Sequence, residues 1–182
     1  MMGNFFADHV RGNRFQHFPE AIQQGILLHR KIDTFTDNHE IVRISKRRLH
    51  ERYGHYDGVI IDIFYDHFLA KNWSSYSQIP LAVFVKNVYQ LLQKHFSILP
   101  KKTQELLPYM IQYDWLYNYQ FEKGIDQVLQ GMNRRTKGKS QMHLAIEDLQ
   151  LLNTELENDF LTFFKDLKNY TSNELATLKK SL

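Results

Sequence analysis

The stretch that decides the fold runs from Val59 to Lys71 and reads Val-Ile-Ile-Asp-Ile-Phe-Tyr-Asp-His-Phe-Leu-Ala-Lys. Its apolar residues do not alternate as in a half-buried strand, and their density predicts a strongly apolar helix. Asp62, Asp66 and His67 interrupt it, and burying a carboxylate without a partner is costly. Asp62 and Asp66 are four residues apart and share one helix face. His67 lies about 100° further round the helix, so Asp66 and His67 can converge only at the edge of that face.

Helical spacing of apolar residues continues on both sides of this stretch, and sustained β alternation is missing. Thr36 or Asp37 is placed to cap the helix that precedes the apolar stretch. Thr171 and Glu174 have the form of a capping box, which predicts a short final helix. The sequence therefore predicts an all-α fold, a single-domain bundle of about seven helices over residues 1–182.

Composition excludes several classes of protein. The chain has 182 residues, of which 43% are hydrophobic and 14% aromatic, and this composition favours one folded domain over disorder. It has no cysteine, so a disulfide scaffold, a thiolate zinc site and a cysteine nucleophile are excluded. The sequence shows no Gly-rich phosphate loop, secretory signal or membrane-spanning apolar run. We therefore expect a cytoplasmic protein without a membrane partner.

Positive charge gathers in two clusters, although the net charge is only +3. The first cluster contains Arg43, Lys46, Arg47, Arg48 and Arg52, and the second contains Arg134, Arg135, Lys137 and Lys139. Each cluster is either a solvated surface or a contact for an acidic partner, whether a protein, a phosphate or a nucleic acid. The overall excess falls short of a nucleic-acid-binding tail, so no nucleic acid is expected as a partner.

Carboxylates and imidazoles recur in the first third of the chain. Asp8 follows an apolar pair and is expected at the edge of the core, while His29 and Asp33 are four residues apart on one helix face. With Asp62 and the Asp66–His67 pair, they supply ligands from three separate helices. Imidazole and carboxylate without thiolate suit Mn, Fe, Mg or Zn in a hydrolytic site.

Simpler interpretations of the same residues stay open. His29 can be a core or capping histidine, and Asp33 and Asp37 can cap the following helix. Asp62 can pair with a basic residue such as Arg30.

Three motifs stand in order along the chain. They are Gly3-Asn-Phe-Phe-Ala-Asp-His-Val-Arg-Gly12, His29-Arg-Lys-Ile-Asp33 followed by Asp37, and Asp62-x-x-x-Asp66-His67-Phe68-Leu69. Further matches are Trp73, Trp115-Leu116 and Gly131-Met132-x-x-Arg135. Together these residues resemble the acyl carrier protein phosphodiesterase family of bacteria, and the resemblance covers nearly the whole chain.

The resemblance implies a specific reaction and cofactor. Such enzymes hydrolyse the phosphodiester between a carrier-protein serine and 4′-phosphopantetheine, giving apo carrier protein and free 4′-phosphopantetheine. They depend on a divalent metal, typically Mn²⁺, with Mg²⁺ or Fe²⁺ as alternatives. They are similar to the all-helical HD-type phosphohydrolases, so an HD-like arrangement of helices is expected.

The resemblance also implies roles for individual residues. Asp8, His29, Asp66 and His67 become the expected metal ligands. Asp62 is either a further ligand or an acceptor that orients one, and Arg30 is expected to contact the phosphate. Both Asp62 and Arg30 are thus expected in the catalytic site.

Carrier proteins are strongly acidic, so the resemblance gives the basic clusters a partner. Arg47, Arg134 and Arg135 are expected to bind the substrate, and the clusters around them to steer it. Two alternatives remain: a metal-dependent phosphohydrolase for a small nucleotide or phosphodiester, and a non-catalytic module that binds an acidic protein. The sequence leaves the oligomeric state open.

One departure from the family concerns the start of the chain. Family members usually begin with a further segment of the Met-Asn-Phe-Leu-Ala-His type before the Gly-Asn motif, and this sequence begins at Met1-Met2 directly before Gly3. The segment carries a histidine that is either a ligand or a packing residue. Either the chain is shortened at its start, or its subgroup does without the segment.

Overall fold

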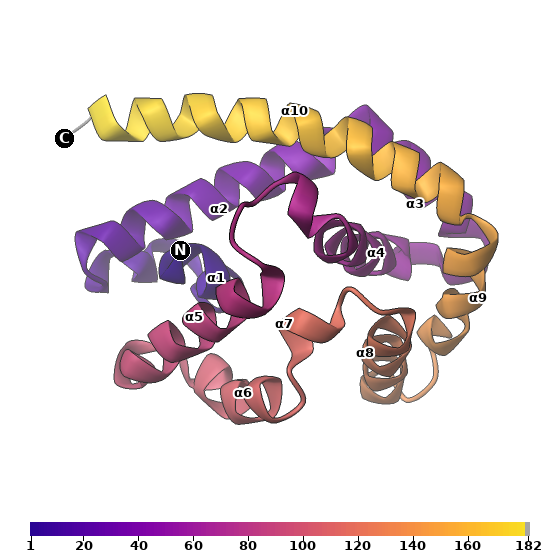
Figure 1. Cartoon of the computed structure of the whole chain (residues 1–182), viewed down its shortest axis with the longest axis horizontal. Helices are drawn as coiled ribbons and strands as arrows, with labels where there is room; N and C mark the ends of the chain where they lie inside the picture. The colour runs from indigo at the N-terminus through magenta and orange to yellow at the C-terminus, as the bar shows by residue number, and fades with distance from the viewer. Residues whose placement is uncertain (181–182) are drawn as a thin grey trace. The chain divides into compact units, whose positions relative to one another are not determined.

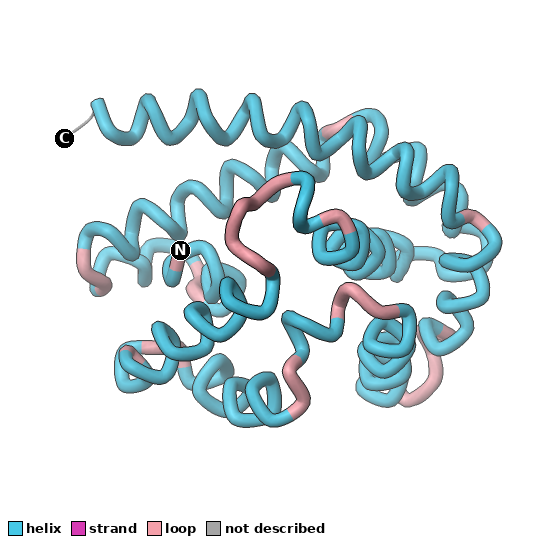
Figure 2. The backbone as a smooth tube through the Cα atoms, viewed as in Figure 1, coloured by secondary structure: helices cyan, strands magenta, loops and turns pink. Residues whose placement is uncertain are grey.

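The computed structural model describes the backbone of residues 1–180 and the side chains of residues 1–177. Helices joined by short loops make up this part of the chain, which contains no strand (Figure 2). The predicted all-α class is confirmed. Ten α-helices are present in the described residues, against the predicted seven. The difference arises because α1, α7 and α9 have only 5, 4 and 7 residues, too few to show helical periodicity in the sequence.

The chain divides into two compact units, each assembled from separate stretches. The first unit comprises residues 1–37, 84–114 and 165–182, and the second comprises residues 38–83 and 115–164. The prediction of a single domain over residues 1–182 stays a prediction.

The first unit begins with the short helix α1 (Met2–Phe6) and two 3₁₀ helices. Its elements are α1, η1 (Ala7–His9), η2 (Gly12–His17), α2 (Glu20–Asn38) up to Asp37, α5 (Leu81–Lys94) from Phe84, η5 (Phe96–Ile98), α6 (Lys101–Gln112) and α10 (Asn153–Lys180) from Lys165. Figure 1 shows α1 beneath α2 in this unit.

Two glycines allow α1 and α2 to approach closely. A Cβ atom on Gly3 would lie 2.1 Å from the carbonyl oxygen of Ile22, and one on Gly25 would lie 3.0 Å from the Asn4 nitrogen. No larger residue fits at Gly3 unless the helices separate. The glycine of the first motif is thus explained by packing, and it fixes the segment that carries Asp8.

The second unit contains the apolar helix of the opening motif. Its elements are α3 (Glu40–Tyr53), η3 (Gly54–Tyr56), α4 (Asp57–Lys71), η4 (Trp73–Ser75), α7 (Trp115–Asn118), α8 (Glu122–Arg135), η6 (Met142–Leu144), α9 (Ala145–Leu151) and α10 up to Phe164, with Asn38 and residues 81–83 at its margins. Within this unit α4 packs against α3 and α8, and α8 packs against α9 (Figure 1).

Helix α4 is apolar on nearly every side, as its sequence predicts. Ile60, Ile61, Phe64 and Phe68 are all completely buried. Phe160 of α10 packs near Phe68, with ring centroids 6.0 Å apart. Burying four such side chains contributes several kcal/mol, at roughly 1.5–3 kcal/mol each. The core of the second unit therefore forms around α4.

The predicted helix boundary at Thr36 or Asp37 is wrong. Helix α2 continues to Asn38, and the residue that precedes α3 is His39, which makes no side-chain capping bond. The hydroxyl of Thr36 instead donates to the carbonyl of Ile32 at 2.9 Å, one turn back in its own helix. The capping interpretation of Asp33 and Asp37 is therefore removed.

The predicted short final helix is also wrong, because α10 runs without a break through Thr171. Contacts within the first unit explain its continuation. The Glu174 carboxylate accepts a hydrogen bond from the Lys31 ammonium group, and the ring of Tyr170 stacks on that of Phe35 at 4.4 Å. Glu174 thus bonds to α2 rather than to the backbone of a new helix.

No helix in the described part of the chain is both long and apolar enough to cross a membrane.

Candidate metal centre

One imidazole and two carboxylates meet in the first unit. The His29 Nε2 atom lies 3.0 Å from an oxygen of Asp8 and 3.1 Å from an oxygen of Asp33. Asp33 comes from the next turn of α2, and Asp8 comes from η1. The three donor atoms all lie within 4.8 Å of one another. We call this group the α2 cluster.

The α2 cluster is open to solvent on its carboxylate side. The side chains of Asp8 and Asp33 are 76% and 49% exposed, whereas that of His29 is 17% exposed. Burial raises the pKa of Asp33, and so do the negative charges of Asp8 and Asp37, while His29 opposes them. Gathered negative charge of this kind is offset when a cation binds.

The geometry of the α2 cluster fits a divalent cation. Two ligands at right angles, each about 2.1 Å from an ion, are about 3.0 Å apart, which matches both separations from Nε2. Without an ion, the His29 Nε2 atom carries at most one proton. It therefore cannot donate a full hydrogen bond to both carboxylates at once. Three protein ligands also leave coordination positions for water or substrate. The donor types suit Mn, Fe or Zn, in keeping with the metal chemistry expected from the sequence.

Arg30 and His9 hold the η1 segment that carries Asp8. An Arg30 Nη2 atom donates to the carbonyls of Val10 at 2.9 Å and Gly12 at 2.7 Å. The His9 Nδ1 atom is 2.8 Å from the hydroxyl of Thr103 in α6. Arg30 therefore positions the loop that supplies a cluster residue, a role that the sequence does not reveal because its acceptors are backbone atoms. Its contact with phosphate stays a prediction.

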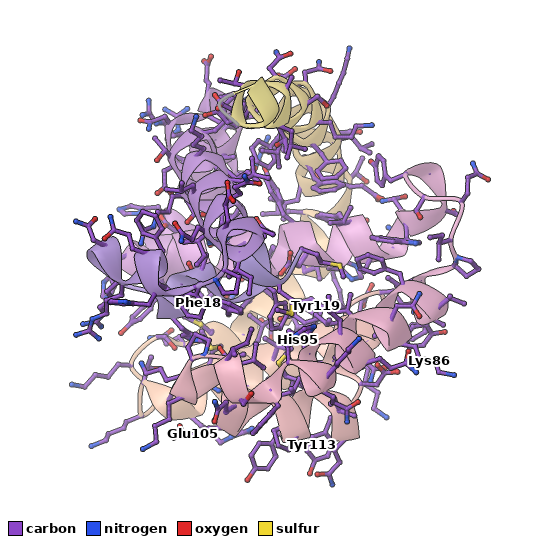
Figure 3. The ribbon with its side chains drawn as sticks, turned by 90° about the vertical axis from the view of Figure 1, so that its left-hand side faces the viewer. Phe18, Lys86, His95, Glu105, Tyr113 and Tyr119 are labelled. Carbon is purple, nitrogen blue, oxygen red and sulfur yellow. The ribbon has the colours of Figure 1, made fainter. Side chains whose placement is uncertain are left out.

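His67 lies on α4 in the second unit and is only 3% exposed. Its Nδ1 atom is 2.7 Å from the carbonyl oxygen of Tyr119, which follows α7 and is labelled in Figure 3. A carbonyl can only accept, so Nδ1 carries the proton and Nε2 keeps its lone pair. Burial lowers the pKa of His67, which favours this neutral form. An imidazole held in this way has the orientation typical of a metal ligand or a general base.

Asp62 and Asp66 lie one turn apart on the same helix, and their side chains reach the surface of α4. Although Asp66 is accessible to water, many protein atoms surround its carboxyl group. This surrounding protein and the charge of Asp62 raise the pKa of Asp66 to about 7. The raised value marks a carboxyl group that a nearby cation would stabilise in its charged form.

The predicted site residues thus fall into two groups. The first unit brings together Asp8, His29 and Asp33, and the second unit carries Asp62, Asp66 and His67 on one helix. Asp33 is the residue that sequence reasoning undervalued. Its signal was the four-residue spacing from His29, which the capping interpretation masked.

The predicted substrate-binding arginines lie in the second unit, and all three are exposed. Arg47 is on α3, and Arg134 and Arg135 form the end of α8. Their contact with a substrate stays a prediction.

The fold and the α2 cluster define an all-helical protein with a carboxylate–imidazole group that can hold a divalent cation. The sequence model of the acyl carrier protein phosphodiesterase family matches residues 1–167, so the chain belongs to that family. The resemblance on which the site was predicted is thereby confirmed.

Curated relatives with this name match almost the whole chain. The acyl carrier protein phosphodiesterase of Klebsiella pneumoniae is 30% identical over 173 residues, covering 94% of this chain and 90% of the relative. That of Photorhabdus laumondii is 29% identical over 178 residues, covering 96% and 88%. No solved structure matches the chain. The HD-like arrangement of helices therefore stays a prediction.

Proposed function

We propose that this chain hydrolyses the phosphodiester that links 4′-phosphopantetheine to the serine of holo acyl carrier protein, with the help of a divalent metal. The observation that carries the proposal is the convergence of Asp8, His29 and Asp33 in a chain of this family. Mn²⁺ is the proposed ion, with Mg²⁺ or Fe²⁺ as alternatives.

The reaction adds one water across the phosphodiester bond. The water oxygen bonds to phosphorus, the bond from phosphorus to the serine oxygen breaks, and one proton passes to the serine oxygen. A bound divalent ion supplies electrostatic stabilisation of the phosphate charge and lowers the pKa of water. In the first unit, Asp8, His29 and Asp33 would hold the ion, and Arg30 would keep Asp8 in place.

The second unit contributes the remaining proposed site residues. Asp66 and His67 are proposed as metal ligands, with Asp62 as a further ligand or an orienting acceptor. The hydrogen bond from His67 Nδ1 to Tyr119 supports this, because it leaves Nε2 free to act as a base or ligand. Arg30, together with Arg134 or Arg135, is proposed to offset negative charge on the substrate phosphate, and Arg47 is proposed to contact the carrier protein.

Mass spectrometry of holo acyl carrier protein tests the proposal directly. The carrier protein is incubated with this chain and Mn²⁺, with and without a chelator, and with the Asp66→Ala variant in parallel. We expect the carrier protein to lose the mass of phosphopantetheine, and both the chelator and the substitution to prevent the loss.

Other outcomes separate the alternatives. Faster hydrolysis of a small phosphodiester with an alkyl leaving group than of holo carrier protein would favour a small-molecule phosphohydrolase. Tight binding of carrier protein without metal and without turnover would favour the non-catalytic module. Either result would contradict the proposed reaction.

A further inference from the structure

The two basic clusters differ in whether the protein itself neutralises them. On α3, the Arg48 Nε atom is 3.2 Å from the carboxylate of Asp159. The Arg52 guanidinium contacts Asp148 at 2.9 Å and Glu147 at 3.2 Å. These ion pairs join α3 to α9 and α10 within the second unit. Much of the positive charge on α3 is therefore used to hold helices together.

The basic residues at the end of α8 have no such partners. Arg134, Arg135, Lys137 and Lys139 are all exposed, and none of them forms an ion pair with a described residue. The sequence contains no acidic residue between Asp126 and Glu147. We call this group the α8 basic loop. Its charge remains available to another molecule.

Hydrogen bonds fix the backbone of the α8 basic loop. Ser140 is 1% exposed, and its hydroxyl contacts Asn133 Oδ1 at 3.2 Å and Thr136 Oγ1 at 2.8 Å. The Thr136 hydroxyl donates to the Asn133 carbonyl at 2.9 Å, and the Gly138 nitrogen donates to the same carbonyl at 2.9 Å. The loop is therefore ordered before any partner binds, which lowers the entropy cost of binding.

Helix stabilisation accounts for only part of this charge. Arg134 and Arg135 lie in the last turn of α8, where cations interact favourably with the helix dipole. Lys137 and Lys139 lie beyond the helix. Lys137 adopts a left-handed backbone with φ of 55° because it follows the helix end, where the Gly138 nitrogen donates to the Asn133 carbonyl and the Lys137 nitrogen donates to the Arg134 carbonyl. The end of the helix therefore explains this backbone conformation, but neither the helix end nor its dipole requires positively charged side chains at Lys137 and Lys139.

The chemistry of the α8 basic loop favours an acidic protein surface over a nucleic acid. Single-stranded nucleic acids are bound by basic residues together with aromatic rings on which bases stack. The chain has no Phe, Tyr or Trp between Phe121 and Phe160. The stretch of chain that carries these four cations thus supplies no ring on which a base could stack, which favours carboxylates on a protein surface as the partner.

We propose that the α8 basic loop is a preformed docking surface for the acidic carrier protein, whereas the α3 arginines that form ion pairs are structural. This inference rests on the proposed function, because that function identifies the partner. It narrows the two basic clusters expected to steer the carrier protein to the second one, and it assigns Lys137 and Lys139 a direct contact with the partner.

Charge reversal at two positions outside the helix tests the docking surface. We compare Lys137→Glu/Lys139→Glu with Lys101→Glu/Lys102→Glu, a matched pair of exposed lysines at the start of α6 that changes the net charge equally. Binding of apo and holo acyl carrier protein is measured by titration calorimetry at low and moderate salt, together with hydrolysis of the holo protein. We expect the first variant to bind about tenfold more weakly at low salt and to lose most of its salt dependence. The affinity of the Lys101→Glu/Lys102→Glu control for carrier protein should change less than about twofold.

Equal weakening in both variants would show general attraction by net charge and overturn the docking assignment. A normal affinity for carrier protein in the Lys137→Glu/Lys139→Glu variant would also overturn it. If the wild type hydrolyses holo carrier protein in either case, the proposed function stands. If the wild type binds the carrier protein without hydrolysis, the proposed function fails, and the binding ratio of the two variants still decides the docking surface. If it binds single-stranded RNA through these lysines and does not bind carrier protein, both fail.

Discussion

The α2 cluster around His29 and the α4 residues around His67 hold their histidines in different ways. In the α2 cluster, His29 Nε2 lies about equally far from two carboxylates, and those carboxylates are open to solvent. On α4, His67 is buried and held through Nδ1 by a backbone carbonyl, while Asp62 and Asp66 extend from the same helix. The first arrangement gathers several donors at one point. The second arrangement fixes the orientation of one ring.

The same packing device supports both groups. Gly3 lets α1 approach α2 and so sets the segment that leads to Asp8. Gly124 lies against the backbone of Asn118, where a Cβ atom would be 2.1 Å from the carbonyl oxygen, and Asn118 precedes the residue that binds His67. The comparison shows that each histidine depends on a short segment held by a close backbone contact.

The largest effect is expected from Asp8→Ala. Removing a carboxylate from the α2 cluster should lower hydrolysis of holo carrier protein at least about 100-fold, because loss of an outer partner of a metal ligand alone costs 10–100-fold. Initial rates at saturating Mn²⁺ give the measurement. The matched control is Glu105→Gln, an exposed carboxylate on the outer side of α6 (Figure 3), which should keep the wild-type rate. A rate unchanged in Asp8→Ala would remove the α2 cluster from the site.

Two substitutions at His67 separate the structural role of its Nδ1 hydrogen bond from the role proposed for Nε2 in hydrolysis. In His67→Asn the amide nitrogen replaces Nδ1 and can still donate to Tyr119, but the group at the Nε2 position is gone. We expect kcat to fall about 100-fold, with only the modest fall in Tm that loss of part of a buried ring produces. In His67→Gln the Tyr119 carbonyl loses its donor, which costs about 1–3 kcal/mol, so Tm should fall as well. Wild-type turnover by His67→Asn would show that Nε2 has no role.

The glycine contacts give the next effect. Gly3→Ala and Gly124→Ala each force a backbone contact apart, and we expect each to destabilise the protein by about 1–3 kcal/mol in urea unfolding. Gly3→Ala should also weaken Mn²⁺ binding, because it displaces the segment before Asp8. Gly131→Ala is the control, since the nearest atom to its Cβ would be 3.8 Å away and alanine favours a helix. Equal stability of all three variants would contradict the packing account.

The smallest effect is expected from Glu157, which contributes to the stability of the second unit in a pH-dependent way. Burial acts to raise the pKa of Glu157, but hydrogen bonds from Asn72 and Lys71 outweigh burial, so the pKa lies below its ordinary value. Its stabilising contribution is therefore complete above pH 4.5 and is lost as the pH falls through the folded value. Glu157→Gln should lower the free energy of unfolding by about 1 kcal/mol at pH 7 and by less at pH 3. A difference that is constant with pH would contradict this linkage.

The sequence predicts the parts of this fold that rest on long apolar periodicity. Helix α4 and the α2 pair of His29 and Asp33 follow from residue spacing alone. The continuation of α10 through Thr171 cannot be predicted from residue spacing. It depends on contacts of Glu174 and Tyr170 in α10 with residues of α2 that lie far away in the sequence. The anchor of His67 is equally hidden, because the acceptor is a backbone carbonyl and every residue has one. Residue spacing thus predicts which side chains could act as ligands, whereas contacts between distant residues decide how those side chains are oriented.

Calorimetric titration of Mn²⁺ into the wild type and the Asp33→Asn variant tests the central claim, that the α2 cluster holds the divalent ion. Asp33 is the decisive position because the structure, rather than the family resemblance, places it beside His29. We expect the wild type to bind Mn²⁺ and the variant to bind more than about tenfold more weakly, because Asn offers a neutral oxygen in place of a carboxylate. Equal affinities in the two proteins would contradict the account.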